Sequence, residues 1–330
     1  MKHKLKITII LIAMFLTTQF IGLLVLHADP FHLETTINGT MQKIPNPAMS
    51  WIQPPEVKTQ SESFSFLTSL VLAFIIAISL FFILTKLKIE FILRAWFFLV
   101  VSIALFISFY AFEKLVPFTI NYYWALAIPI LLSIPLAFVK IYQRNFLIHN
   151  LTELLIYPGL ATVFVPILNI YTIIILLILI SIYDMWAVWH SGIMQKMAKY
   201  QINKLNIFSG FFVPYVSKRV KSKIEKMKKT LGKAELKKKG IKVNVAILGG
   251  GDVIFPLITA GVVLATGIFN LPFGLKPFVG GILPALFVLA GATLGLTYLL
   301  IFSEKKKFYP AMPFITAGIF AGMILSWILL

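Results

Sequence analysis

Residues 170–189 read IYTIIILLILISIYDMWAVW, and Asp184 is the only charged residue in this run. An α-helix rises about 1.5 Å per residue, so about 20 residues cross the hydrocarbon core of a bilayer. The run is therefore predicted to be a transmembrane helix. An aspartate at the centre of such a helix costs about 2.5–3.5 kcal/mol on insertion scales, so Asp184 is expected to have a partner, a water-filled cavity or a function.

The composition of the whole chain is that of a polytopic membrane protein. Hydrophobic residues make up 59% of its 330 residues and charged residues 13%, whereas soluble chains carry about 25% charged residues. Apolar segments long enough to span a bilayer lie at roughly 6–26, 64–84, 91–112, 119–138, 151–167, 170–189, 243–265, 277–302 and 310–330. We predict an all-α fold with nine transmembrane helices.

The first of these segments has some features of a signal peptide. Lys2, Lys4 and Lys6 precede an apolar run, as in a secretory leader. The run is too long for the apolar region of a leader, and Leu26-His27-Ala28 is a poor cleavage site. The first segment is therefore predicted to stay as a helix of the mature protein.

The positions of the basic residues predict the orientation. If the N-terminus is inside and nine helices alternate, 26 of the 30 basic residues fall in inside segments, 15 of them in the loop 190–242. Cytoplasmic loops carry an excess of lysine and arginine, so we predict a cytoplasmic N-terminus and an external C-terminus. This distribution also accounts for most of the net charge of +18, so we predict no nucleic-acid partner.

Two connecting segments are long. The outer segment 27–63 contains several prolines and is expected to be an irregular external loop. The inner loop 190–242 holds four apolar residues at helical spacing among lysines: Val220, Ile224, Met227 and Leu231. This pattern fits a basic amphipathic helix on an anionic membrane surface or, equally, a solvated linker helix.

The chain has a second aspartate within a predicted span, Asp252. Counted along the helices, Asp184 and Asp252 lie roughly 8 and 13 Å below the inner surface, so their carboxylates can meet in one water-accessible pocket. Such a pair shares one proton near neutral pH; the charged member can deprotonate water while the protonated member polarises a peptide carbonyl. The aspartates alone do not separate this aspartic-protease arrangement from the ion pathway of a transporter.

The residues around both aspartates resemble the motifs of the intramembrane aspartyl proteases, the presenilin and signal-peptide-peptidase family. The first match is Tyr183-Asp184, and the second is Gly249-Gly250-Gly251-Asp252. Pro256, four residues after the second aspartate, looks more like the signal-peptide-peptidase and archaeal branches. The resemblance implies that Asp184 and Asp252 are catalytic and that Tyr183 and the three glycines support the site. Glycines lack a Cβ, so they also allow a substrate backbone to approach.

The family also carries a Pro-Ala-Leu motif at the inner start of its last span. Pro284-Ala285-Leu286 is a literal match, but it lies in the eighth span near the outer side. Pro310-Ala311-Met312-Pro313 lies at the inner end of the ninth span and differs by methionine for leucine, a volume-conserving change. We therefore assign the motif to residues 310–313. Its two prolines disfavour a regular first helical turn, so an extended segment could hold substrate beside the aspartates.

A short apolar island at residues 207–214 interrupts the basic inner loop. Related proteins have a comparable segment before the seventh span. It could pair with an unwound substrate as an added strand, or it could be a loop that dips into the membrane interface. The sequence leaves both interpretations open.

The resemblance implies an intramembrane aspartyl endopeptidase that cuts transmembrane segments or signal peptides, with no metal and no organic cofactor. Residues 1–169 would then form a scaffold of five helices and residues 170–330 the catalytic part. The chain has no cysteine, which excludes a cysteine nucleophile. Its composition suits the plasma membrane of an archaeon, and homo-oligomer formation is left open.

Two alternatives remain. A prepilin or preflagellin peptidase also uses Gly-x-Gly-Asp, but it would leave the Tyr183-Asp184 and 310–313 matches unexplained. A secondary transporter or ion channel would use intramembrane carboxylates as well. The lack of an internal repeat and a shortage of other buried charges argue against it.

Overall fold

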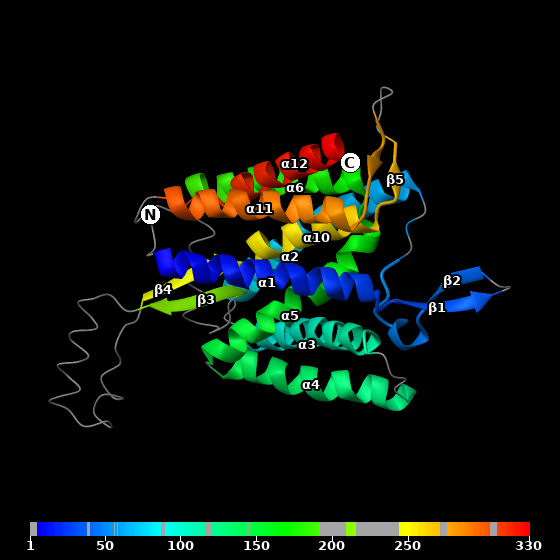
Figure 1. Ribbon diagram of the computed structural model, residues 1–330. Coiled ribbons are helices and arrows are strands. Elements are labelled where there is room, and N and C mark those ends of the chain that lie inside the picture. Colours follow the sequence, from blue (N-terminus) through cyan, green and yellow to red (C-terminus); the bar gives the residue numbers. More distant parts are fainter. Residues whose placement is uncertain are drawn as a thin grey trace.

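Within the part of the chain that it describes, the computed structural model is a bundle of nine α-helices (Figure 1). These are α1 (Leu5–Ala28), α2 (Gln60–Lys86), α3 (Glu90–Lys114), α4 (Tyr122–Tyr142), α5 (Phe146–Phe164), α6 (Ile170–Trp186), α10 (Gly250–Ala265), α11 (Ile282–Phe302) and α12 (Met312–Leu329). The structure describes residues 5–37, 40–55, 57, 59–86, 90–116, 121–143, 145–191, 209–215, 244–270, 276–303 and 309–330. Eight helices are long and apolar enough to cross a membrane, and α10 is a shorter apolar helix. The predicted nine-helix fold is confirmed.

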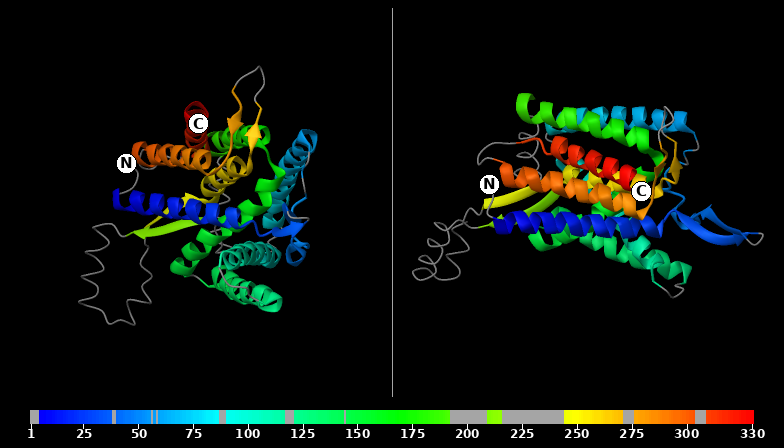
Figure 2. Two further views of the ribbon diagram at one scale, coloured as in Figure 1. Left: turned by 45° about the vertical axis from the view of Figure 1, so that its right-hand side comes forward. Right: turned by 45° about the horizontal axis from the view of Figure 1, so that its top comes forward.

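Three two-stranded antiparallel sheets lie at the ends of this bundle (Figures 1 and 2). Strands β3 and β4 lie at one end, and the other two pairs lie at the opposite end. The pairs are β1 (His32–Ile37) with β2 (Thr40–Pro45), β3 (Gly210–Tyr215) with β4 (Asn244–Gly249), and β5 (Ile268–Phe269) with β6 (Phe278–Val279). The expectation of an irregular loop over 27–63 is wrong for the first pair, in which β-branched residues favour strands.

The predicted seventh span, 243–265, also needs correction. Its first part is strand β4, and only Gly250–Ala265 is helical. The strand contains the β-branched residues Val245 and Ile247. Gly249 is still extended, with φ −65° and ψ 146°, and the helix begins at the next residue, Gly250. Asp252 therefore lies in the first turn of α10 and not nine residues inside a helix. The amphipathic pattern at 220–231 falls outside the described residues.

Asparagine caps fix where several helices begin. Asn169 and Thr172 form a reciprocal capping box at the start of α6, and Asn145 caps α5 through the amides of Leu147 and Ile148. Such caps satisfy amide groups that have no partner within the helix, which matters most where water is scarce. The predicted fifth span starts earlier than expected for this reason, at Phe146.

Helix α10 lies at the centre of the bundle and contacts α1, α5, α6, α11 and α12. Its buried residues join the largest apolar core of the protein. Helices α11 and α12 pack closely, because Gly291 and Gly295 on one helix face Gly318 and Gly322 on the other. A Cβ on any of these glycines would lie 2.1–2.3 Å from a backbone oxygen of the facing helix. This is the small-residue packing typical of membrane helices.

Candidate active site

Asp184 lies in the last turn of α6 and is only 7% exposed. One turn earlier, the Ser181 hydroxyl hydrogen-bonds the Thr316 hydroxyl of α12 at 2.9 Å, and both residues are buried. This bond ties the end of α6 to the beginning of α12. The Asp184 carboxylate is thereby held against the segment that precedes and starts α12.

Backbone amides of that segment donate to the Asp184 carboxylate. The Met312 amide is 3.0 Å from Asp184 Oδ2, and the Ala311 amide also hydrogen-bonds this carboxylate. Pro310 and Pro313 have no N–H, so these two amides are the only backbone donors in residues 310–313. The first amides of a helix have no intrahelical partner, and the helix dipole favours a negative charge there. The N-terminus of α12 thus forms an anion site that Asp184 fills.

Asp252 is placed at the N-terminus of α10 by a related device. Gly249 is the extended N-cap residue, with φ −65° and ψ 146°, and its amide donates back to the Asp252 carboxylate. An acidic residue three positions after the N-cap commonly makes this return bond. Asp252 is partly exposed and lies within electrostatic range of Asp184. The end of α6, which carries Asp184, and the start of α10, which carries Asp252, both lie at the end of the bundle that carries β3 and β4 (Figure 1).

The three glycines before Asp252 have different surroundings. A Cβ on Gly250 would lie 2.6 Å from Ser209 Oγ and 2.7 Å from the Tyr157 hydroxyl oxygen, so no side chain fits there without movement. A Cβ on Gly251 would meet only the Phe255 ring, at 3.7 Å, and Gly251 is exposed. Space for an approaching backbone therefore exists at Gly251, whereas Gly250 is required by packing.

Tyr183 is directed toward α2. Its ring makes an edge contact with Phe74, with ring centroids 5.9 Å apart, and a tilted contact with Trp186 at 6.4 Å. Both partners are exposed apolar residues of the helix surface. The Tyr183 side chain therefore packs α6 against α2, and Tyr183 directly precedes Asp184 in the chain.

The two Pro-Ala sequences lie at opposite ends of the bundle. Residues 310–313 contact Asp184, as described above. Residues 284–286 lie within the first two turns of α11. The next residue, Phe287, packs its carbonyl on Gly322 in the second half of α12. The literal motif match is thus remote from both aspartates.

Buried ionisable residues away from the aspartates contradict the expected shortage of such charges. Lys140 of α4 and Glu153 of α5 form an ion pair whose side chains are 4% and 1% exposed. His149 lies beside the pair. The signal in the sequence was Glu153, an ionisable residue within the predicted span 151–167, whereas Lys140 and His149 lie just outside the predicted spans. The described residues contain no group of three or more histidine, aspartate or glutamate side chains suited to a metal ion.

Residues 49–330 match the family described as signal-peptide peptidase, presenilin aspartyl protease. The chain belongs to this family. Two solved structures, both of a presenilin family intramembrane aspartate protease, are similar over nearly their full length. The C222 crystal form matches with a TM-score of 0.55 and 15% identity, covering 98% of this chain and 99% of that one. The P2 form matches with a TM-score of 0.52 and 16% identity, covering 97% of each.

At these identities the two structures show a shared fold. No curated protein sequence gives a match. Membership of the family establishes the activity: the protein is an aspartic endopeptidase that acts within membranes on transmembrane substrates. The family match therefore favours this protease over the transporter and prepilin-peptidase alternatives.

Proposed function

We propose that Asp184 and Asp252 are the catalytic dyad of this protease. The observation that carries the proposal is that each carboxylate accepts a backbone N–H hydrogen bond at a helix N-terminus and that both aspartates lie at the same end of the bundle. One carboxylate would take a proton from water as the water oxygen bonds to the scissile carbonyl carbon, while the other donates a proton to the carbonyl oxygen. The resulting tetrahedral intermediate collapses when the C–N bond breaks and the leaving amine takes up a proton.

The glycine and proline motifs would support this chemistry from two sides. We propose that Gly251 allows the substrate backbone to approach closely, because it has no side chain. Gly249 and Gly250 would shape the turn before Asp252. Pro310, Ala311, Met312 and Pro313 would fix the amides that hold Asp184. Tyr183 would support the end of α6 through its contacts with α2.

Substrate would bind as an extended strand. A transmembrane helix hides its carbonyls in hydrogen bonds, so the bond to be cut must first leave the helix. Strands β3 and β4 lead directly to Gly249 and Asp252, and an unwound segment could add to this sheet. We therefore propose that the described part of the 207–214 segment belongs to the substrate-binding sheet.

We further propose that the N-terminus is cytoplasmic, that the C-terminus is external and that the site works from the inner face. The concentration of basic residues in the inner segments supports this orientation. Residues 170–330 would carry the catalytic groups and residues 1–169 the scaffold. The composition supports a location in an archaeal plasma membrane, without a nucleic-acid partner or cofactor.

The dyad is tested by removing one titratable group at a time. Asp184→Asn and Asp252→Asn keep the size of the side chain but delete its ionisable proton. Asp29→Asn is the matched control, because Asp29 is the only other aspartate and lies at the opposite end of the bundle. Purified variants are incubated in liposomes with single-span helical peptides, and products are identified by mass spectrometry.

We expect no cleavage from either dyad variant and wild-type cleavage from the control, blocked by an aspartyl-protease transition-state analogue. Retained cleavage in either dyad variant would refute the assignment.

A further inference from the structure

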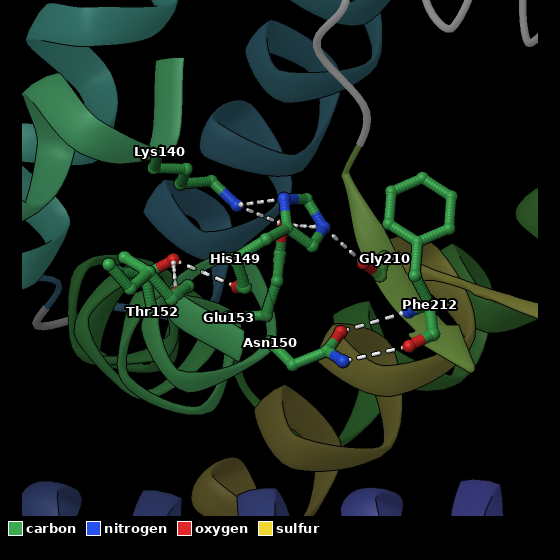
Figure 3. Close-up of polar contacts among 8 residues, drawn as sticks. Lys140, His149, Asn150, Thr152, Glu153, Gly210 and Phe212 are labelled. Atoms are coloured by element: carbon green, nitrogen blue, oxygen red, sulfur yellow. Dashed lines mark hydrogen bonds and ion pairs between the residues drawn. The ribbon is translucent and has the colours of Figure 1, made fainter. Parts of the chain in front are cut away.

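The outer edge of β3, which faces away from β4, is occupied by side chains of α5 (Figure 3). Asn150 Nδ2 donates to the Phe212 carbonyl at 2.7 Å, and the Phe212 amide donates to Asn150 Oδ1 at 2.9 Å. One side-chain amide thus makes both hydrogen bonds that a neighbouring strand would make to Phe212. The Asn150 side chain therefore acts as a one-residue third strand.

His149 makes a third bond to the same edge. Its Nε2 is 2.8 Å from the Gly210 carbonyl oxygen, which can only accept, so Nε2 carries the hydrogen. Nδ1 lies 3.4 Å from Lys140 Nζ, and Nε2 lies 3.6 Å from Glu153 Oε1. The imidazole is therefore fixed by the buried Lys140–Glu153 ion pair on one side and by β3 on the other (Figure 3).

The hydrogen bonds of Asn150 and His149 to β3 also affect the position of Asp252, because β3 pairs with β4 and β4 leads to this aspartate. Along an antiparallel strand, successive residues direct their backbone groups to opposite edges. Because Phe212 bonds to Asn150, Phe211 and Val213 bond to β4, opposite Leu248 and Ala246. The pairing ends at Gly249, whose amide holds Asp252.

Tyr157 secures the same arrangement from further along α5. Its ring makes an edge contact with Phe211 of β3, with centroids 5.9 Å apart. Its hydroxyl fills the space beside Gly250 that a Cβ would need. Helix α5 therefore contacts both β3 and the start of α10. It fixes the positions of these two elements relative to the scaffold helices of residues 1–169.

We propose that Asn150, assisted by His149, is a positioning and specificity-determining residue for the proteolysis assigned above. By closing the outer edge of β3, it leaves the edge of β4 with Val245 and Ile247 as the place where a substrate strand can add. By fixing the register of the sheet, it sets which substrate bond lies opposite Asp252. This inference rests on the proposed dyad and adds a residue that does not touch the reacting atoms.

The test compares asparagine substitutions within one helix. Asn150→Leu is similar in size and deletes both bonds to Phe212. Asn145→Leu is the matched control, since it removes the α5 cap, which stabilises the fold by about 1 kcal/mol, without touching β3. Cleavage rate and the distribution of cut sites are measured by mass spectrometry on one helical peptide in liposomes.

For Asn150→Leu we expect kcat/KM to fall by roughly fivefold for each lost hydrogen bond. We also expect cleavage to spread from the principal bond to neighbouring bonds. Asn145→Leu is expected to unfold at a lower temperature but to cut at the wild-type positions.

Asn150→Asp provides a second readout that a loss of stability would not produce. Its carboxylate keeps the acceptor for the Phe212 amide but repels the Phe212 carbonyl, and only the protonated acid can donate to that carbonyl. The share of cuts at the principal bond should therefore recover as pH falls. The nearby titratable groups Lys140, His149, Glu153 and Tyr157 are the same in every variant, so Asn150→Leu at each pH corrects for them.

An unchanged distribution of cut sites in both Asn150 variants, with wild-type cleavage intact, would overturn the positioning role and leave the dyad standing. So would a shift of equal size in Asn145→Leu. Loss of the dyad itself is read separately, from cleavage by Asp184→Asn or Asp252→Asn. If Asn150→Leu does not fold, the pH dependence of Asn150→Asp decides.

Discussion

Gly250 and Gly251 are adjacent in sequence, yet substitution by alanine should change the free energy of unfolding in opposite directions at the two positions. At Gly250 the new Cβ would lie 2.6 and 2.7 Å from two oxygen atoms, about 0.7 Å closer than an ordinary contact allows. Tyr157 is 2% exposed and packs on Phe211, so its ring has little room to move. Overpacking of this kind costs about 1–3 kcal/mol.

At Gly251 the nearest atom to a new Cβ is an ordinary 3.7 Å away. Alanine in a helix is favoured over glycine by about 0.5–1 kcal/mol. We therefore expect Gly250→Ala to lower the free energy of unfolding by about 0.5–2 kcal/mol and Gly251→Ala to raise it by up to about 1 kcal/mol. Denaturant unfolding in detergent micelles, followed by circular dichroism, measures both.

A double-mutant cycle identifies the cause. Tyr157→Phe removes one of the two oxygens that crowd the new Cβ, the one at 2.7 Å, so the cost of Gly250→Ala should shrink by about 0.5–1 kcal/mol in that background. Additive effects, or equal destabilisation by alanine at both glycines, would refute the steric argument. If substrate approaches at Gly251 as proposed, Gly251→Ala should also cleave more slowly although it is stably folded.

Three further predictions concern other parts of the protein. Pro313→Ala should reduce cleavage in protein that still folds, whereas Leu286→Ser should lower only thermal stability; equal loss of cleavage in both would reject the motif assignment. Lys140→Met or Glu153→Leu alone should destabilise by about 3–5 kcal/mol and the double variant by clearly less, as measured by unfolding, because each single change leaves a buried charge unpaired. At Asp29, burial raises the pKa, but hydrogen bonds from Lys43 and His32 outweigh burial and lower the pKa of this carboxyl overall. Its stabilisation is therefore present above the unfolded-state pKa and is lost as pH falls through the folded-state pKa; thermal scans against pH should show this loss in the wild type and not in Asp29→Asn.

Local sequence predicted the helices well because each span must satisfy its own backbone hydrogen bonds in lipid. This makes length and hydropathy sufficient for α1, α3 and α6, whose predicted bounds agree with the observed ones to within a few residues. The prediction was wrong at residues 244–249, where an apolar strand and an apolar helix look alike over six residues. The glycine run was the available signal, but it was interpreted only as a feature of the active site.

The choice between the two proline motifs, residues 284–286 and 310–313, also depended on their positions in the predicted topology and not on their residue identities. Topology alone placed residues 310–313 on the same side as Asp184, and the structure brings the Met312 amide to 3.0 Å from that carboxylate. The contact itself could not be predicted, because it joins residues 128 positions apart through a backbone group that carries no residue identity.

The sequence by itself determined that the chain spans a membrane, how many helices it uses and which aspartates lie within it, because these properties follow from the local cost of burying polar groups. Tertiary structure alone decided what surrounds the aspartates. The amides at the start of α12, the space at Gly251 and the hold of Asn150 on β3 arise where α5, α6, α10 and α12 meet. Hydrogen bonds to backbone groups and the fit of one surface to another depend on distances that no single segment of sequence specifies.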